Sequence, residues 1–271
     1  MAEKHASRAR DIFDAYGVLT EAWDGDNIHL GLFEAPDEPF AAGAERATER
    51  LAAAAALSAG EEVLETACGI GGAARYLART RGVRVTATNI AEAQLELGRE
   101  RTERAGLADL VRFEPADFQE LPSRDRSFDC YWCQEAWLYA ADKDAVVREA
   151  FRILRPGGRL VVTEFVLVRP IPEDFERELL AAVGTTGFWT SAQYEAAFAD
   201  SGFADVRVED WSEHGVPSWE RVVGALAAGR RGFEERLGAE LVEMTATRFE
   251  LWLRAFRAGN LGWVFFSARR P

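Results

Sequence analysis

Apolar residues between positions 60 and 165 recur with two different periods. Five short apolar runs predict strands at 62–67, 84–89, 111–114, 128–133 and 158–165. Between these runs, Ala, Leu and Tyr recur at helical spacing in 71–81, 91–105 and 141–154. Strands that alternate with helices pair in parallel through right-handed crossovers. The pattern therefore predicts an α/β fold.

The chain on either side of this alternation predicts helical layers. Toward the C-terminus we expect a helix at 190–201, a strand at 205–210, a long helical stretch at 218–258 with breaks near Gly232 and Gly238, and a last strand at 262–268. Toward the N-terminus the pattern predicts an amphipathic helix at 7–22, a loop at 23–30 and a second helix at 41–57.

Together these elements predict one enlarged domain with a Rossmann-like, seven-stranded, mostly parallel sheet. We expect an N-terminal helical cover at 1–57 and a core at 58–271. Helical lid elements, inserted before the last strand, are expected at about 170–200 and 215–258.

Composition narrows the class of partner. The formal charge of −13 argues against nucleic acid and against an anionic membrane surface, because both reward clustered Lys and Arg. A small-molecule substrate fits better. Residues 1–10 are charged and lack an apolar core, and no apolar run approaches the length of a membrane span. We therefore expect a cytoplasmic monomer or homodimer with no membrane partner.

The three cysteines predict neither a metal site nor a redox pair. Cys68, Cys130 and Cys133 lack the paired spacing of a zinc site. Cys130-x-x-Cys133 lies in an alternating aromatic run that is typical of a buried strand, whereas the redox motif begins a helix. Reduced thiols are the expectation.

A glycine-rich turn follows the first predicted strand. Gly69-x-Gly71-x-x-Ala74 fits the fingerprint of a nucleotide-binding crossover, in which glycines let the backbone turn sharply and approach a ligand. Glu65, just before the turn, would repel a pyrophosphate but suits a ligand that carries an ammonium and a sulfonium. S-adenosylmethionine is such a ligand.

Polar residues also end the next two predicted strands. In an open parallel sheet, ligands bind outside the carboxyl ends of the strands. Asn89 ends the second strand, where an amide can hold a ribose diol. Asp117 follows the third strand and can accept from the adenine amine, while Phe118 packs on the ring. Glu65 could instead compensate a helix dipole, Asn89 could cap a helix and Asp117 could be a turn residue.

Three longer segments resemble successive motifs of the class I S-adenosylmethionine-dependent methyltransferases. They are residues 63–78, residues 117–129 with the pattern Asp-Phe-x-x-Leu-Pro-x-x-Asp-x-Ser-Phe-Asp, and Leu-Arg-Pro-Gly-Gly at 154–158. The resemblance implies S-adenosylmethionine as the cofactor. It adds further cofactor-binding positions, namely Ala67, Ile90, Gln94 and Gln134. Glu65, Ala67 and Asn89 stand where the family usually has aspartate, glycine and an acid.

A narrower resemblance concerns the acceptor. Residues 23–31, 71–78, 89–94 and 134–139 are similar to the glycine, sarcosine and dimethylglycine N-methyltransferases, and more loosely to natural-product methyltransferases. Many of those relatives place histidine in the segment that here reads Leu138-Tyr139. Since a hydroxyl or an unactivated carbon needs a base and an unprotonated amine does not, the missing histidine favours an amine acceptor.

Residues near the fourth and fifth strand ends are the candidates for the chemistry. The catalytic candidates are Tyr139, Glu135 and His29, of which His29 lies in the N-terminal cover together with Tyr16. Aromatic rings attract alkylated ammonium groups, and carboxylates can orient them. The substrate-binding candidates are Trp137, Tyr139, Glu164, Arg169 and Trp189. For Arg169 a solvated surface position is the simpler interpretation, and we expect Trp132 in the core.

Four functions compete at this point. The first is an N-methyltransferase of a small amine such as sarcosine or dimethylglycine. The second is a C- or O-methyltransferase of secondary metabolism that acts on an isoprenoid, a sugar or a polyketide. The third is a cyclase that uses the same fold and cofactor as a scaffold. The fourth, an NAD-dependent dehydrogenase, rests on the glycines alone, and Glu65 counts against it.

Overall fold

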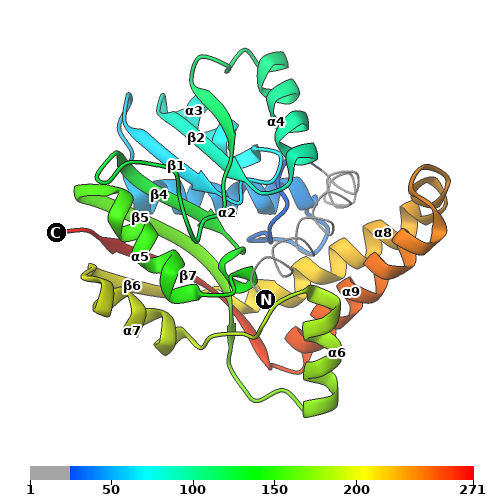
Figure 1. The fold of residues 1–271 in the computed structure, drawn as a ribbon. Coiled ribbons are helices and arrows are strands. Elements are labelled where there is room, and N and C mark those ends of the chain that lie inside the picture. The colour runs from blue at the N-terminus through cyan, green and yellow to red at the C-terminus, as the bar shows by residue number, and fades with distance from the viewer. Residues whose placement is uncertain (1–24) are drawn as a thin grey trace.

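A computed structural model describes residues 25–271, so the expected helix at 7–22 and Tyr16 lie outside the described residues. Seven strands form one sheet in the order β3-β2-β1-β4-β5-β7-β6 (Figure 1). The strands are β1 (Glu62–Thr66), β2 (Arg84–Asn89), β3 (Val111–Pro115), β4 (Phe128–Gln134), β5 (Leu154–Leu167), β6 (Ala204–Asp210) and β7 (Leu261–Arg269).

The first five strands run parallel, and β7 pairs antiparallel with both β5 and β6. This arrangement confirms the predicted seven-stranded, mostly parallel sheet. The chain adds β2 and β3 on one side of β1 and then returns to place β4 on the other side. A ligand crevice forms at such a reversal, outside the carboxyl ends of the strands. The fold therefore puts the site at the ends of β1 and β4.

Helices cover both faces of the sheet. Those in the described residues are α2 (Phe40–Ala55), α3 (Gly72–Arg81), α4 (Glu92–Arg104), α5 (Lys143–Ile153), α6 (Glu173–Val183), α7 (Ser191–Ser201), α8 (Gly215–Leu237) and α9 (Ala239–Arg257), with short 3₁₀ turns η2 (Trp137–Tyr139) and η3 (Ser212–His214). Figure 1 shows α5 and α7 on one face and α2 behind the other.

The core consists of two hydrophobic clusters, one on each face of the sheet. Because successive strand residues point to opposite faces, Val161 packs with α2 and the lid helices, whereas Leu160 and Val162 pack with α5 and α7. Both clusters are rich in aromatic residues. The two-sided burial explains why the strands of the parallel part read as continuous apolar runs.

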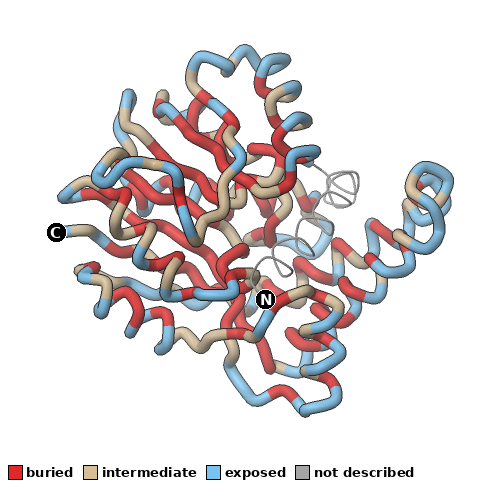
Figure 2. The backbone as a smooth tube through the Cα atoms, in the orientation of Figure 1, coloured by how far each residue is buried: buried red, intermediate tan, exposed pale blue. Residues whose placement is uncertain are grey.

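The C-terminal helices differ from the sequence prediction in one detail. The break expected at Gly232 is wrong, because α8 continues through it to Leu237. The break expected at Gly238 is confirmed: this residue has φ +86° and separates α8 from α9. The two helices form an antiparallel pair that extends beyond the sheet (Figure 1), buried near the sheet and exposed at its outer end (Figure 2).

The boundaries of the cover and lid stay a prediction, although helices lie in each of the expected ranges: α6 and most of α7 within 170–200, and α8 and α9 within 215–258. None of the helices in residues 25–271 is long and apolar enough to cross a membrane.

Candidate functional site

The turn between β1 and α3 has the backbone of a ligand loop. Ala67, Gly69 and Gly71 all have positive φ, at +51°, +55° and +76°. A Cβ atom on Gly71 would lie 2.5 Å from the Phe113 ring, so this position accepts only glycine. The amide of Gly71 donates to the Cys68 carbonyl at 2.8 Å, which closes the turn. Ala67 adopts a conformation that favours glycine, which accounts for the residue usual there.

Glu65 lies at the end of β1, below this loop. Its side chain is 5% exposed, and burial raises its pKa to about 8, although Arg75 and the Ala74 amide act in the opposite direction. The Oε2 atom has no hydrogen-bond partner among the described residues. A buried carboxylate oxygen without a partner is costly, and a cationic ligand would supply the missing interaction.

Asn89 ends β2 and links the loop to helix α4. Its Oδ1 accepts from the Ile90 amide at 2.8 Å, and its Nδ2 donates to Gln94 Oε1 at 2.7 Å. A longer contact of 3.4 Å joins Nδ2 to the Gly69 carbonyl. The helix-capping alternative for Asn89 is wrong, because the N-cap residue of α4 is Ala91 and no side chain caps this helix. Asn89 instead holds the turn before α4 and brings Ile90 and Gln94 to the edge of the glycine loop.

Asp117 and Phe118 follow β3. The Asp117 carboxylate accepts from the Gln119 amide at 2.9 Å, and its carbonyl accepts from the Glu120 amide at 3.1 Å. Phe118 is partly buried against the cluster on the α5 side. The turn orders both residues at the third strand end, beside Asn89, whose carbonyl accepts from the Ala116 amide at 3.0 Å.

The end of β4 supplies Gln134 and Glu135. Gln134 Oε1 accepts from Trp132 Nε1 at 2.9 Å, and its buried Nε2 has no partner among the described residues. Glu135 has φ +56°, a strained value for a residue with a Cβ. Its two carboxylate oxygens each accept from the Leu30 amide at 3.1 Å, and burial raises its pKa, with the nearby Glu164 adding to the effect.

Glu164, in β5, holds the loop that carries Tyr139. It has no exposed surface, and it accepts from the Leu138 amide at 2.9 Å and from the Phe165 amide at 2.7 Å. Burial raises its pKa to about 8. Thr185 donates to the Leu138 carbonyl, so both backbone polar groups of Leu138 are held. The neighbouring Tyr139 is partly buried at the same strand end.

His29 lies in the cover, next to Leu30. Its Nδ1 is 2.8 Å from the Leu30 carbonyl, and its Nε2 is 3.1 Å from Thr48 Oγ1. Burial lowers its pKa to about 4, so the ring is neutral at pH 7, and these contacts fit the tautomer with hydrogen on Nδ1. With both nitrogens engaged, His29 orders the cover segment over Glu135.

The side chains of Trp137 and Trp189 make their contacts in the core, and Arg169 lies at the surface. Trp137 is fully buried between Tyr131 and the aromatic rings of α7, and its indole N–H donates to Tyr131 Oη at 3.1 Å. Trp189 is partly buried and packs on Tyr194. Arg169 is exposed, and Trp132 lies in the core. We therefore assign Trp137 to the core and Arg169 to the surface.

Sequence reasoning missed the contact between the cover and the glycine loop. Asp26 forms ion pairs with Arg75 on α3, at 2.6 Å, and with Arg101 on α4. A Cβ atom on Gly72 would overlap the Asp26 carbonyl, so the cover backbone lies directly on the loop. The segment that begins at Trp23 carried the signal, because it is part of the family-like rim motif, but His29 was its only selected residue and Asp26 was not considered.

The residues present fit S-adenosylmethionine. The unpartnered oxygen of Glu65 suits a cation, and the unpartnered Nε2 of Gln134 is a donor for the carboxylate of the methionine part. The loop at Gly69 and Gly71 has the positive φ values that let a glycine backbone turn sharply beside a ligand. In residues 25–271, no group of three or more His, Cys, Asp and Glu side chains is placed to hold a metal ion.

Comparisons with known proteins agree with this assignment. A family model described as a methyltransferase domain matches residues 64–162. The 27-O-demethylrifamycin SV methyltransferase of Amycolatopsis mediterranei is 35% identical, over 96% of this chain and 95% of its own length. The glycine/sarcosine/dimethylglycine N-methyltransferase of Actinopolyspora halophila is 31% identical over 96% of this chain, which spans only 47% of that relative.

Among solved structures, a protein of Galdieria sulphuraria provisionally described as a sarcosine dimethylglycine methyltransferase superposes with a TM-score of 0.86 at 26% identity. The match covers 99% of this chain and 98% of that one. With the loop, the strand-end residues and these relatives in agreement, the chain belongs to the class I S-adenosylmethionine-dependent methyltransferases.

Proposed function

We propose that this methyltransferase transfers the methyl group to the nitrogen of a small amine, such as sarcosine or dimethylglycine. The observation that carries the proposal is a pair of carboxylates, the partly buried Glu135 just after β4 and the fully buried Glu164 in the adjacent strand β5. Burial is the larger cause of the raised pKa of Glu135, and the charge of Glu164 raises it further. The Glu135 amide donates to the carbonyl of Thr163 at 2.7 Å, so Glu135 lies beside the backbone position that precedes Glu164.

Such a pair favours a cationic acceptor. Two neighbouring carboxylates are costly to ionise in a buried site, and an ammonium group lowers that cost. The amine must lose its proton before it attacks the methyl group in line with the leaving sulfur. A carboxylate with a raised pKa is a suitable proton acceptor near neutral pH. Glu135 is therefore the proposed base, with Tyr139 beside it as a contact for the acceptor.

The described histidines do not offer a competing base. His29 has both nitrogens engaged within the cover. His214 precedes α8, and its Nδ1 accepts from the Phe33 amide at 3.3 Å. His5 lies outside the described residues. The remaining polar groups at the ends of β4 and β5 thus suit an amine better than a hydroxyl that needs a strong base.

A second candidate is methylation of an oxygen or carbon in a larger natural product. The lid supports it, because its inner side is apolar and aromatic: Trp219 stacks on Trp252 at 5.5 Å between ring centroids, and Phe165 packs on Trp252 at 5.0 Å. The relative from Amycolatopsis, which is 35% identical, has a name that describes such an activity.

An acceptor panel distinguishes these functions. Purified protein is incubated with the cofactor and one acceptor at a time, sarcosine, dimethylglycine, other small amines, sugars and polyketide alcohols, and release of S-adenosylhomocysteine is measured. We expect release with amines. Release only with oxygen or carbon acceptors contradicts the proposal, and cofactor binding without release from any acceptor indicates a scaffold such as a cyclase.

A variant tests the role of Glu135. Glu135→Gln keeps an acceptor for the Leu30 amide but removes the charge, so we expect a loss of turnover of about 10²-fold or more with a cationic amine. Glu173→Gln, whose parent side chain is 91% exposed, is the matched control and should leave turnover unchanged. Equal turnover of the two variants would show that Glu135 is not the base of the reaction.

The location, the partners and the oligomeric state of the protein are also proposals. We also propose a cytoplasmic location, and the acidic composition supports the absence of a nucleic-acid partner. A monomer or homodimer is expected, and the larger-acceptor alternative would place the enzyme in secondary metabolism.

A further inference from the structure

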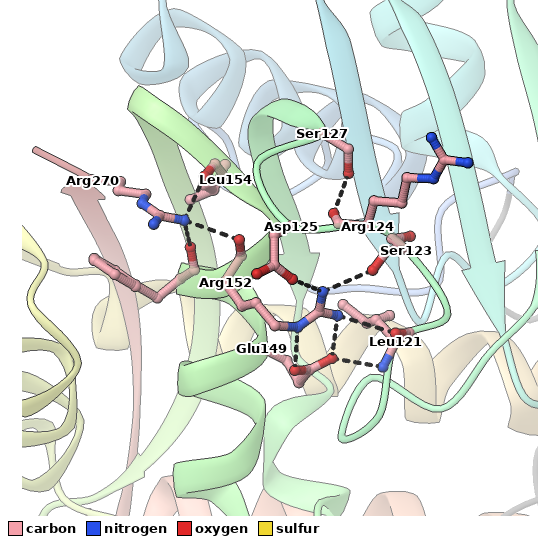
Figure 3. Close-up of polar contacts among 10 residues, drawn as sticks. Leu121, Ser123, Arg124, Asp125, Ser127, Glu149, Arg152, Leu154 and Arg270 are labelled. Atoms are coloured by element: carbon pink, nitrogen blue, oxygen red, sulfur yellow. Dashed lines mark hydrogen bonds and ion pairs between the residues drawn. The ribbon is translucent and has the colours of Figure 1, made fainter.

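Arg152, near the end of α5, uses every hydrogen-bond donor of its guanidinium group (Figure 3). Nε and Nη2 donate to the two carboxylate oxygens of Glu149 at 2.7 and 2.8 Å. Nη1 donates to the Ser123 carbonyl at 2.8 Å and to Asp125 Oδ1 at 2.7 Å, and Nη2 also reaches the Leu121 carbonyl at 3.1 Å. An arginine has five such donors, and all five are engaged here.

Three of these five bonds end on one segment, the connection between β3 and β4. Glu149 adds a fourth, because its Oε2 accepts from the Leu121 amide at 2.8 Å. Both backbone polar groups of Leu121 are thereby held by the Glu149–Arg152 pair. Leu121 itself is buried in the cluster on the α5 side. The pair fixes the backbone of this segment to α5 rather than merely neutralising charge.

The same segment is attached to the other end of α5. The amide of Asp142, the residue that caps α5, donates to Gln119 Oε1 at 2.9 Å. Gln119 in turn donates through its amide to Asp117 Oδ1 at 2.9 Å. Residues 117–121 are therefore held at Gln119 and again at Leu121.

Asp117 and Phe118 are the residues proposed above to receive the adenine. They lie four and three positions before Leu121, within one turn closed by the bond from the Glu120 amide to the Asp117 carbonyl. A loop that is ordered before the ligand arrives loses less conformational entropy on binding. Arg152 contacts neither of these two residues, so its effect on the cofactor would pass through the segment.

A second arginine at the same place offers a contrast. Arg270 donates from Nη1 to the carbonyls of Phe151, Arg152 and Leu154, at 2.6, 2.9 and 2.7 Å, and so caps the C-terminal end of α5 (Figure 3). Its guanidinium lies over the Phe151 ring. None of the described hydrogen bonds of Arg270 reaches residues 117–125.

We propose that Arg152 is a positioning residue for the cofactor, which holds residues 117–125 on α5 so that Asp117 and Phe118 are ordered to receive the adenine. This inference rests on the proposed adenine contacts of Asp117 and Phe118, and it is independent of the acceptor. Lysine cannot replace the arginine, because an ammonium group cannot donate to all five of the oxygen atoms that accept from the guanidinium group.

The test measures cofactor affinity and stability separately. Arg152→Lys, Arg152→Met and the control Arg270→Met are compared by calorimetric titration with S-adenosylhomocysteine and with 5′-methylthioadenosine, which keeps the adenosine but lacks the amino acid. We expect both Arg152 variants to bind both ligands about tenfold more weakly, the effect of losing one or two hydrogen bonds. Arg270→Met should lower Tm but keep both Kd values within about twofold of the parent.

Three results would overturn the inference. Unchanged affinity for both ligands in both Arg152 variants would show that Arg152 does not position the cofactor. An equal loss of affinity in Arg152→Lys and Arg270→Met shows that the arginines act only through general stability. If Arg152→Met does not fold, the ligand affinities of Arg152→Lys alone are compared with those of Arg270→Met. Asp117→Ala serves as the reference: unchanged Kd in that variant means that the adenine assignment itself has failed, whichever acceptor the enzyme methylates.

Discussion

Burial decides the protonation of the carboxylates at the strand ends. Glu65 and Glu164 both have a pKa of about 8, raised from the ordinary 4.5 by loss of water. Between pH 4.5 and 8 the folded chain holds protons that the unfolded chain has released. The stability that the two carboxyl groups contribute is therefore fully present below pH 4.5 and is lost as the pH rises through 8. The ligand-free protein should be more stable at pH 5 than at pH 9.

The first prediction concerns cofactor affinity and pH. A bound cation lowers the pKa of Glu65, so binding releases a proton below pH 8. The Kd for S-adenosylmethionine should then fall by up to about tenfold per pH unit from pH 6 to 8 and level off above. Titration calorimetry at several pH values checks this. In Glu65→Gln the dependence should be weaker, and an identical slope in parent and variant would exclude Glu65 as the cation partner.

The second prediction concerns the strained backbone at Ala67. With φ +51°, the alanine costs about 1–2 kcal/mol that glycine would not. Glycine also makes the unfolded chain more flexible, at a cost of about 0.4–1 kcal/mol. Ala67→Gly should therefore keep or raise the free energy of unfolding, by up to about 1.6 kcal/mol, as measured by urea denaturation. A clear loss of stability would mean that the Ala67 methyl group packs favourably.

At the scale of elements, the strand–turn–helix unit from β1 to α3 could be predicted almost completely from the sequence. The apolar run, the carboxylate and the glycines each have a local cause in the backbone geometry. The break at Gly238 was equally predictable, whereas Gly232 was not, because a glycine within a helix costs only about 1 kcal/mol and tertiary packing can outweigh it.

Side-chain direction after a strand end was harder to predict. Alternation sets the direction along β4, but η2 follows at once and turns Trp137 into the cluster with α7. Long-range partners left no local pattern either. Leu30 and Glu135 are 105 positions apart, so nothing near Glu135 in the sequence indicates what its carboxylate holds.

The third prediction tests the glycine loop as an element. Gly71→Ala adds a methyl group 2.5 Å from the Phe113 ring at a positive φ, and should cost about 2–4 kcal/mol of stability and abolish cofactor binding. Gly60→Ala is the matched control, since φ is +83° and no atom lies within 4 Å of the added Cβ. It should cost only about 1 kcal/mol, and binding should persist. Thermal melts and calorimetry measure both, and equal behaviour of the two variants would contradict the close packing at Gly71.

At the scale of the whole molecule, the N-terminal cover joins the sheet to the lid. Leu30 donates to Glu135 at the end of β4, and the next residue, Gly31, exchanges two hydrogen bonds with Ser218 of α8, at 3.2 and 3.1 Å. The segment that orders the proposed base is thus the segment that anchors the lid helix. We therefore expect the same cover to be involved in binding both the cofactor and the acceptor.

The fourth prediction tests this connection. Ser218 is fully buried, and Ser218→Ala leaves the Gly31 amide and carbonyl without their partner. The variant should lose about 1–3 kcal/mol of stability, measured by denaturant unfolding. Because Gly31 follows Leu30, turnover should fall as well, while Arg231→Ala, at an exposed position of the same helix, should change neither. Full activity in Ser218→Ala would separate the cover from the reaction.

The most direct test of the central claim is the identity of the atom that receives the methyl group. The protein is incubated with S-adenosylmethionine labelled with ¹³C in its methyl group and with a mixture of small amines and hydroxylated natural products, and the products are analysed by NMR. The partly buried Glu135 just after β4 and the fully buried Glu164 in β5 predict that the label appears as N-methyl carbon. Label found only in O-methyl or C-methyl groups would contradict it.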